Sequence, residues 1–276
     1  MTRFAPAIPA LALAATLAAC GPPAPPQAAA GTETPDGAPD AGYVAPPEIV
    51  SGVRRPQGLA LSGTAPAGAE VQLVAPDGKG GMATADDKGA WSLIVPAPMA
   101  APAMYALSAR IGERVVRAEG AVLAVPAPGP PVVLARAGFA ALPLEGPLPR
   151  LQVTALDYDA GGGAAVAGVG PARARVRLSI DGVEAGLDQS DARGRFAVIG
   201  ANRPLEPGAR RLRVEADGGA QALTADVLAQ VSPVAPLNGS AFRAVRQDGG
   251  WRVDWARAGG GVQSTFVFDV PPEPAP

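Results

Sequence analysis

The sequence contains no histidine, which removes whole classes of catalytic and metal-binding chemistry. Ser-His-Asp and Cys-His catalysis need an imidazole base, and His-ligated zinc or iron sites need an imidazole ligand. Because Cys20 is the single cysteine, no disulfide can form within the chain. We therefore expect no metal or other cofactor, and we expect that the chain is not an enzyme.

The net charge is small, and long apolar runs are absent. The formal net charge is -2, which gives no electrostatic reason to expect nucleic acid as a partner. No segment reaches the roughly 18 uninterrupted apolar residues that a membrane-spanning helix needs. What the chain has in abundance is 35 Gly and 32 Pro, so frequent turns are expected.

The first twenty residues have the pattern of an export signal. Arg3 supplies a positive charge, residues 4–16 are mostly apolar, and small residues follow. The end of this segment, Leu17-Ala18-Ala19-Cys20, resembles a bacterial lipobox. The resemblance implies that residues 1–19 are a lipoprotein signal peptide and that Cys20 becomes the acylated (palmitate-bearing) N-terminus. Several acyl chains give a stable membrane anchor, whereas a single chain is marginal.

The alternative is an ordinary secretory signal with a chance cysteine. The position of the single cysteine where a lipobox requires it favours lipidation. Gly21, in place of Asp, resembles the pattern of outer-membrane lipoproteins. The expected location is therefore the bacterial outer membrane, with the protein held by lipid on the periplasmic or surface face.

Residues 20–46 form a Pro- and Ala-rich linker with one aromatic residue, Tyr43. Such a segment buries too little apolar surface to offset the entropy lost on ordering. We expect a disordered, semi-stiff spacer that reaches on the order of 80 Å when extended.

From residue 47 onward the sequence predicts short strands, because Val, Leu and Ile alternate with polar residues between Gly- and Pro-containing turns. An internal repeat strengthens this interpretation. Residues 61–91 align without a gap with residues 166–196, each residue pairing with one 105 positions later. A repeat of this length indicates a duplicated domain.

Each copy contains an Asp-x-x-Gly turn followed by an aromatic residue. In such a turn the Asp side chain accepts backbone N–H bonds and the Gly adopts a left-handed conformation. The aromatic residue opens the next strand and is expected to anchor the core. The predicted turn and core residues are Asp86, Gly89 and Trp91 in the first copy, and Asp191, Gly194 and Phe196 in the second.

The repeated pattern Gly…Pro-x-x-x-x-Val-x-Leu…Asp-x-x-Gly-x-Trp/Phe resembles bacterial Ig-like domains. The stretch 151–168 is similar to the Ig-like modules of alphaproteobacterial envelope proteins that also carry a peptidoglycan-binding LysM domain, although no LysM domain is found here. The resemblance covers roughly residues 55–232 and implies tandem Ig-like β-sandwiches. It implies no particular activity, because this architecture hosts many functions.

The region after residue 232 predicts a β-meander of three strands, at 241–247, 251–257 and 262–269. Trp251 and Trp255 share one face of the middle strand. The first interpretation is a hydrophobic face that packs on the second module or extends its sheet. The alternative is a stacking platform, with both rings as candidate binding residues for a sugar or a partner.

Three carboxylate pairs are candidates for acid–base chemistry: Asp86 with Asp87, Asp157 with Asp159, and Asp188 with Asp191. Glycoside hydrolysis needs two carboxylates held across a cleft. These pairs are expected on turn-like segments, where Asp usually serves the backbone. No calcium-loop spacing is present.

The sequence therefore predicts an all-β protein with two tandem Ig-like β-sandwiches, at 47–126 and 130–232, and a C-terminal meander and tail at 233–276. The expected function is a non-catalytic cell-envelope lipoprotein whose modules act as a spacer or protein-docking surface. The alternative is a lipoprotein that binds peptidoglycan or polysaccharide through the C-terminal aromatic strand. The expected partners are the membrane, through the lipid, and an envelope protein or peptidoglycan.

Overall fold

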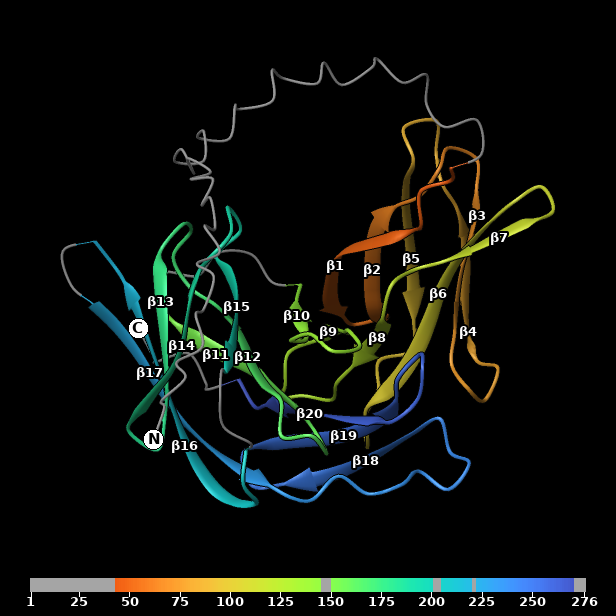
Figure 1. The fold of residues 1–276 in the computed structure, drawn as a ribbon. Coiled ribbons are helices and arrows are strands. Elements are labelled where there is room, and N and C mark those ends of the chain that lie inside the picture. Colours follow the sequence, from red (N-terminus) through yellow and green to blue (C-terminus); the bar gives the residue numbers. More distant parts are fainter. Residues whose placement is uncertain (1–42, 145–149, 201–204, 220–221, 271–276) are drawn as a thin grey trace, which may run out of the picture. The chain divides into compact units, whose positions relative to one another are not determined.

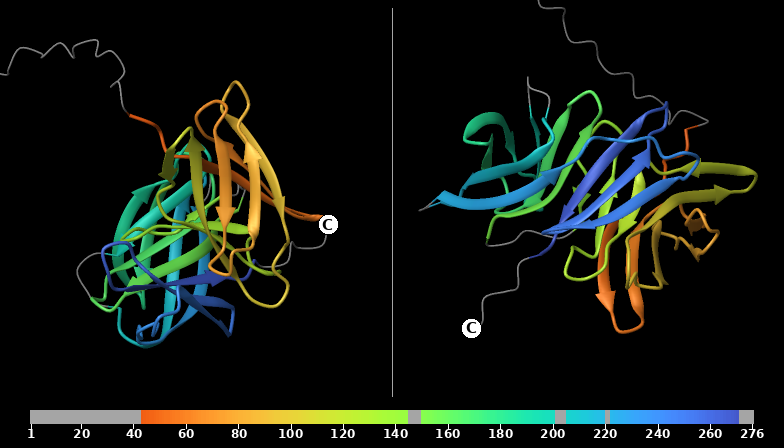
Figure 2. Two further views of the ribbon diagram at one scale, coloured as in Figure 1. Left: turned by 90° about the vertical axis from the view of Figure 1, so that its right-hand side faces the viewer. Right: turned by 90° about the horizontal axis from the view of Figure 1, so that it is seen from below.

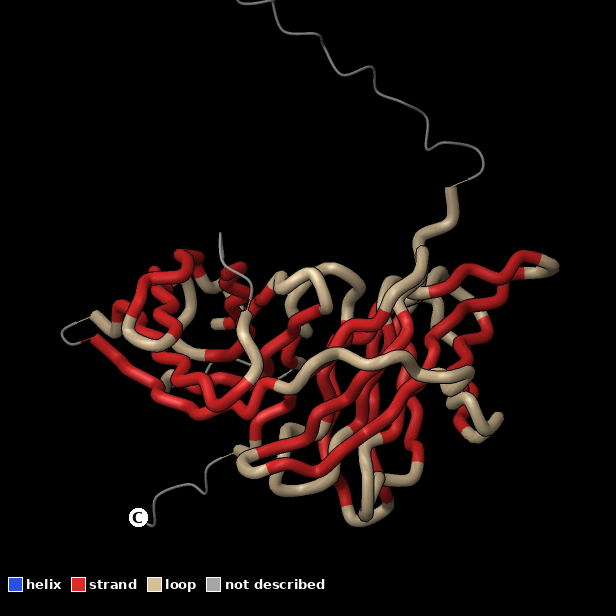
Figure 3. Tube along the Cα trace, turned by 60° about the horizontal axis from the view of Figure 1, so that its bottom comes forward, coloured by secondary structure: helices blue, strands red, loops and turns tan. Residues whose placement is uncertain are grey.

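The computed structural model describes residues 43–144, 150–200, 205–219 and 222–270. These residues are all-β, with strands joined by turns and loops and no helix among them (Figure 3). This confirms the predicted fold class. Within the described part, accordingly, no helix could cross a membrane. The predicted signal peptide, Cys20, most of the linker and the tail after residue 270 lie outside the described residues.

The first sandwich has two antiparallel sheets. The three-stranded sheet has the order β1-β2-β5. The opposing sheet has the order β10-β9-β8-β6-β3-β4, and β7 pairs with β6 outside this path. The strands are β1 (Glu48–Arg55), β2 (Gly58–Thr64), β3 (Glu70–Val74), β4 (Gly80–Thr84), β5 (Ala90–Val95), β6 (Ala103–Ile111), β7 (Arg114–Arg117), β8 (Ala121–Ala124), β9 (Val132–Ala135) and β10 (Leu142–Pro143).

The second sandwich repeats this plan and gains three strands at its edge (Figure 1). One sheet has the order β14-β13-β16-β17, and the other β15-β12-β11-β20-β19-β18. The strands are β11 (Gln152–Asp159), β12 (Ala164–Val169), β13 (Arg175–Ile180), β14 (Val183–Gln189), β15 (Arg195–Gly200), β16 (Gly208–Asp217), β17 (Ala222–Val231), β18 (Phe242–Gln247), β19 (Gly250–Ala256) and β20 (Val262–Phe268).

The duplication is visible in the packing of one glycine per copy. Gly63 on β2 pairs with Trp91 on β5, and Gly168 on β12 pairs with Phe196 on β15. A Cβ atom on Gly63 would lie 2.6 Å from the Trp91 ring, and one on Gly168 would lie 2.4 Å from the Phe196 ring. Each aromatic ring therefore covers a position where only glycine fits. This explains why glycine and the aromatic residue occur at matching positions in the two aligned copies.

The predicted Asp turns have the same geometry in both copies. Asp86 Oδ1 accepts the N–H groups of Lys88 and Ala90, each at 2.8 Å. Asp191 Oδ1 accepts those of Arg193 at 2.8 Å and Arg195 at 3.0 Å. The turn glycines, Gly89 and Gly194, have φ values of 80° and 75°. The carboxylates thus satisfy the backbone, as the sequence predicts.

The module boundaries differ from those expected from sequence. Strands β9 and β10, which were assigned to the second sandwich, extend a sheet of the first. The meander extends the sheet of the second sandwich through the pairing of β20 with β11, which confirms that part of the first interpretation. Backbone pairing across long sequence separations determines these assignments, and local patterns carry no information about it.

The central strands of the six-stranded sheet are buried on both faces. One face, which includes Leu156 and Phe266, contributes to the core of the second sandwich. The other face, which includes Ala155, Val253 and Val267, packs on residues of β6, β8 and β9. Two further views show β18, β19 and β20 side by side (Figure 2). The sheet therefore packs the two sandwiches together, so they are not independent modules.

Replacing Gly168 with alanine tests the buried glycine–aromatic contact. The added Cβ would lie 2.1 Å from the Gln152 carbonyl oxygen as well as against Phe196. We expect a loss of about 1–3 kcal/mol in the free energy of unfolding, the usual range for overpacking. Urea unfolding measures it. Gly81→Ala is the control, because its nearest new contact is 3.4 Å away; equal losses in both variants would contradict the assignment.

Candidate functional site

The two candidate binding tryptophans have different environments. Trp255 is only 4% exposed and lies in the core between β19 and the first sandwich. Its Nε1 donates a hydrogen bond to Thr265 Oγ1 at 3.0 Å. Trp251 is partly buried against the same core, and the Arg246 guanidinium lies 5.6 Å from its ring centroid. A platform built from both rings is therefore incompatible with the structure, which instead favours the packing interpretation.

A buried polar cluster lies at the centre of the six-stranded sheet, on the face that meets the first sandwich. Asp157 on β11 is directly opposite Thr265 on β20. Its Oδ1 accepts the Thr265 hydroxyl at 2.6 Å and the Gln263 amide at 3.1 Å. Its Oδ2 accepts the backbone N–H of Ala141, from the segment before β10, at 2.6 Å.

Gln263 on β20 extends this cluster to the loop between β9 and β10. Its Oε1 accepts the N–H of Gly138 at 2.9 Å. Its Nε2 donates to the carbonyl oxygens of Arg136 at 3.1 Å and Phe139 at 3.2 Å. Asp157, Gln263 and Thr265, which we call the polar clamp, therefore bind the 136–141 segment of the first sandwich's sheet to β11 and β20.

Burial dominates the protonation equilibrium of Asp157. Removal from water raises its pKa to about 6, and hydrogen bonds from Thr265, Ala141 and Gln263 oppose the increase. The charge of Arg136 also lowers this pKa. Every hydrogen bond that Asp157 makes is accepted, which suits a carboxylate and leaves the group positioned to hold the loop.

A second buried carboxylate, Asp254 on β19, lies on the opposite face of the sheet. Burial disfavours its ionisation, but hydrogen bonds from Arg252, Ser264 and Arg243 are together stronger and lower its pKa. Arg252 donates through Nε and Nη2 to the two oxygens, at 2.7 and 2.9 Å. The sheet therefore holds an ionised Asp254 in an arginine pair, as buried charges require.

The structure corrects the expected position of one carboxylate pair. Asp157 does not lie on a turn but within strand β11, whereas Asp159 lies at its end. Both border a hollow of about 110 Å³ together with Phe139, Tyr158 and Gln263. Asp159 is engaged as well: it accepts the Gly161 N–H at 2.9 Å and forms an ion pair of 3.1 Å with Arg257.

In the other two pairs, Asp86, Asp188 and Asp191 accept backbone N–H groups. Asp188 Oδ2 accepts the N–H of Ala197 on β15 at 2.8 Å, and Asp191 occupies its turn as described. No group of three potential metal-ligating side chains is found in the part of the chain that the structure describes. These carboxylates are therefore used to hold strands and turns.

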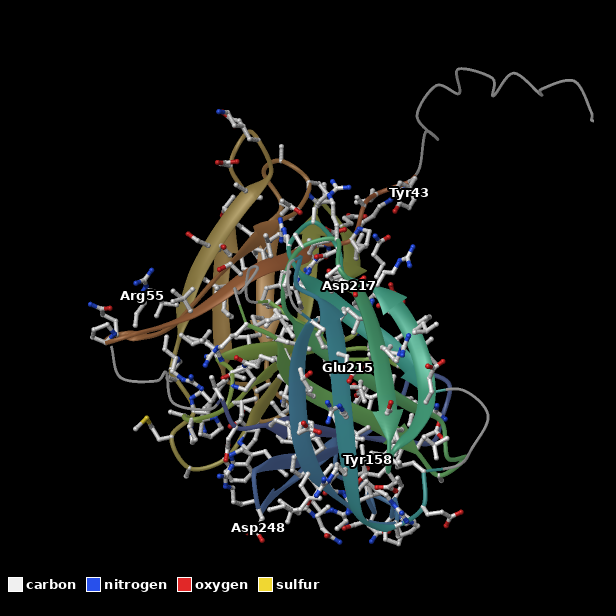
Figure 4. The ribbon with its side chains drawn as sticks, turned by 90° about the vertical axis from the view of Figure 1, so that its left-hand side faces the viewer. Tyr43, Arg55, Tyr158, Glu215, Asp217 and Asp248 are labelled. Atoms are coloured by element: carbon white, nitrogen blue, oxygen red, sulfur yellow. The ribbon has the colours of Figure 1, made fainter. Side chains whose placement is uncertain are left out.

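A larger hollow of about 250 Å³ lies at one end of the second sandwich. Its apolar wall includes Ile180, Val183 and Leu205, and an ion pair of 3.0 Å between Arg210 and Asp181 lies at its rim. Sequence reasoning did not identify this hollow, because it depends on how the β13–β14 hairpin packs. Figure 4 shows other side chains of this sandwich, among them Glu215 and Asp217 on the neighbouring strand β16.

Comparisons with known proteins add little to this geometry. No family model and no curated protein matches the chain. Among solved structures, it matches a chain described as "Biofilm associated protein - BSP domain", with 16% identity and a TM-score of 0.24. The match covers 70% of this chain and 30% of the other, so the chain spans less than a third of that protein's length.

The raised pKa of Asp157 predicts an unusual pH dependence of the free energy of unfolding. A folded-state pKa of about 6 means that the native state keeps a proton which the unfolded chain loses above its ordinary value of 3.8. The stability contributed by Asp157 is therefore full below pH 3.8 and is lost as the pH rises to about 6, amounting to about 3 kcal/mol. Between pH 4.5 and 7.5 the free energy of unfolding, measured with urea, should fall by about 2 kcal/mol in wild type, because the unfolded chain is already largely ionised at pH 4.5, and this fall should be absent in Asp157→Asn.

The control for this experiment is Asp254→Asn. Asp254 has a lowered pKa, so its contribution is present above pH 3.8 and is lost at more acidic pH. Between pH 4.5 and 7.5 the Asp254→Asn variant should therefore keep the wild-type pH dependence. A wild-type stability that does not fall over this interval would contradict the assignment to Asp157.

Trp255 is expected to stabilise the fold and not to bind glycan. Trp255→Ala should lower the free energy of unfolding by about 3–5 kcal/mol, the usual cost of removing a buried aromatic ring. Trp251→Ala should cost less, because that ring is only partly buried. A peptidoglycan pulldown at a temperature where both variants are folded should retain Trp251→Ala and wild type equally; weaker retention of the variant would revive the binding hypothesis.

Proposed function

We propose that this chain is a non-catalytic lipoprotein of the bacterial cell envelope, whose paired sandwiches act as a rigid spacer and docking body. The observation that supports this proposal is the six-stranded sheet, whose central strands are buried on both faces and fastened by the polar clamp. A spacer must keep its length under load, and two sandwiches that share a buried sheet resist bending better than modules joined by a flexible linker.

The engagement of the buried carboxylates supports a non-catalytic role. A general acid or base must reach the proton of a substrate. The oxygens of Asp157 accept three donors from the protein, and those of Asp254 are held by arginine and serine side chains. Using either group in catalysis would require breaking the contacts that hold the sheets together.

The proposed membrane anchor depends on Cys20 and the lipobox before it. Acylation there, followed by the Pro- and Ala-rich linker, would hold the β body away from the membrane surface. The proposed location is the outer membrane, on its periplasmic or surface face. No second function is proposed for the aromatic strand, because Trp255 is buried.

Metabolic labelling with palmitate tests the anchor. Wild type is expected to incorporate label and to fractionate with membranes, whereas Cys20→Ser should lose the label and leave the lipid-bound fraction. Globomycin, which blocks cleavage of lipoprotein signals, should cause an unprocessed form of wild type to accumulate.

Ser92→Cys with Cys20→Ser is the matched control, because it keeps one thiol in the chain at an exposed position outside the lipobox. It should remain unlabelled. Absence of label from wild type, or its persistence in Cys20→Ser, would refute the anchor.

A further inference from the structure

The hollow of about 250 Å³ at one end of the second sandwich has no role in the proposed function. Both sheets line it, through Ala164 and Gly200 on one side and Ile180 and Ala185 on the other. Ile180 and Ala185 also pack against the core, so the hollow is an opening of the core to the outside. An apolar space of roughly 150 Å³ already holds benzene, so a ring-sized group fits here.

The duplicated first sandwich shows which side chains close this end of the fold. Leu59 on β2 is paired with Val95 on β5, and the equivalent pair in the second sandwich is Ala164 with Gly200. Leu59 and Val95 are each only 1% exposed and belong to one core cluster. Alanine and glycine therefore leave out most of the two side chains that fill this end of the first sandwich.

A tyrosine also fills the end of the first sandwich. Continuing the β3–β6 ladder by one residue places Tyr105 opposite Ala75, which is the equivalent of Ile180. Ile180 is instead paired with Leu212, so the second sandwich lacks the buried ring. Ile180 is larger than Ala75 and refills part of the space, because its Cδ1 lies 3.8 Å from the Cβ position of Gly200. The hollow is what remains unfilled.

The rim of the hollow is acidic. Asp181, Glu184 and Glu206 line it against one cation, Arg210. Arg210 pairs with Asp181 at 3.0 Å, and Arg177, from outside the hollow, pairs with Glu184 at 3.4 Å. Among the described residues, no cation forms an ion pair with the Glu206 carboxylate. The charge that remains at the mouth attracts a cation and repels an anion.

We propose that this hollow binds a small molecule that joins an apolar group of about the size of an aromatic ring to an ammonium group. The apolar group occupies the space that branched and aromatic side chains fill in the first sandwich. The ammonium group stays at the rim beside Glu206 and in contact with water. The site needs neither the lipid nor the membrane, so this proposal and the proposed anchor are tested independently.

Methyl NMR of the full-length protein, labelled at the isoleucine δ1 methyl groups, tests the site with phenethylamine as the probe. The Ile180 signal should shift saturably, with a dissociation constant on the order of 1 mM for a ligand of this size. The Ile111 signal should stay in place, because this residue lies on β6 of the first sandwich. An Ile180 signal that does not move, or that moves no more than Ile111, would overturn the proposal.

The charge of the ligand is tested with 2-phenylethanol and phenylacetate, which keep the ring and replace the ammonium with a neutral or an anionic group. Both should bind several-fold more weakly than phenethylamine, phenylacetate most weakly. Glu206→Gln should remove most of this preference. Glu215→Gln is the matched control, because it removes the same charge from β16, where Glu215 pairs with Arg213 at 3.0 Å. Equal binding of the three ligands, or the same loss in both variants, would refute the ammonium assignment.

Filling the hollow with the residues of the first sandwich tests its location. Ala164→Leu with Gly200→Val should abolish the Ile180 shift, and the nearest atom to the new Cβ at residue 200 lies 3.3 Å away. Ala106→Leu is the control, because it adds a leucine at an exposed position of β6. Thermal unfolding shows whether each variant is folded. Undiminished binding by the folded double variant would contradict the site, and if that variant unfolds, the ligand series still decides.

Discussion

The structure depends on one sheet being covered on both faces. Almost every residue of strands β11 and β20 is buried. Many antiparallel sheets leave one face in water, so this pattern indicates a sheet that lies between two layers. The second sandwich supplies one cover and β6, β8 and β9 supply the other. Because polar residues lie in this interior, each must find a partner, and Asp157 finds three.

This constraint explains why the polar clamp is built as it is. An ionised carboxylate between two apolar layers is costly unless donors surround it. The Ala141 N–H and the side chains of Gln263 and Thr265 are those donors, and they come from both sides of the junction. A shifted arrangement that kept Asp157 buried would leave its charge without these donors, so the cluster favours the observed packing of the sheets over other buried arrangements.

Much of the fold was predictable because it is local. The alternation of Val71 and Leu73, the turns at Asp86 and Asp191, and the three strands of the meander are all encoded within a few residues. The internal repeat added the pairing of each aromatic ring with its glycine. These features depend on short-range backbone chemistry that a sequence shows directly.

What the sequence did not reveal was which strands from distant segments become neighbours. Asp157 was expected on a turn-like segment, where Asp usually serves the backbone. The partner that makes it interior, β20, begins about a hundred residues later at Val262. For the same reason the sequence does not decide whether Trp255 packs in the core or belongs to a binding platform. Alternation shows which side of a strand a residue faces, but not what covers that side.

The two sandwiches began as equivalent units, and their edges show how they diverged. In the second, β11 is paired by β20 and the N–H of Ala197 on β15 is capped by Asp188. In the first, the Arg54 guanidinium of β1 donates to the Gly129 carbonyl at 2.9 Å, fastening this strand to the loop before β9. The two units therefore hold their edges in different ways: the second uses a paired strand and a carboxylate, and the first uses an arginine side chain.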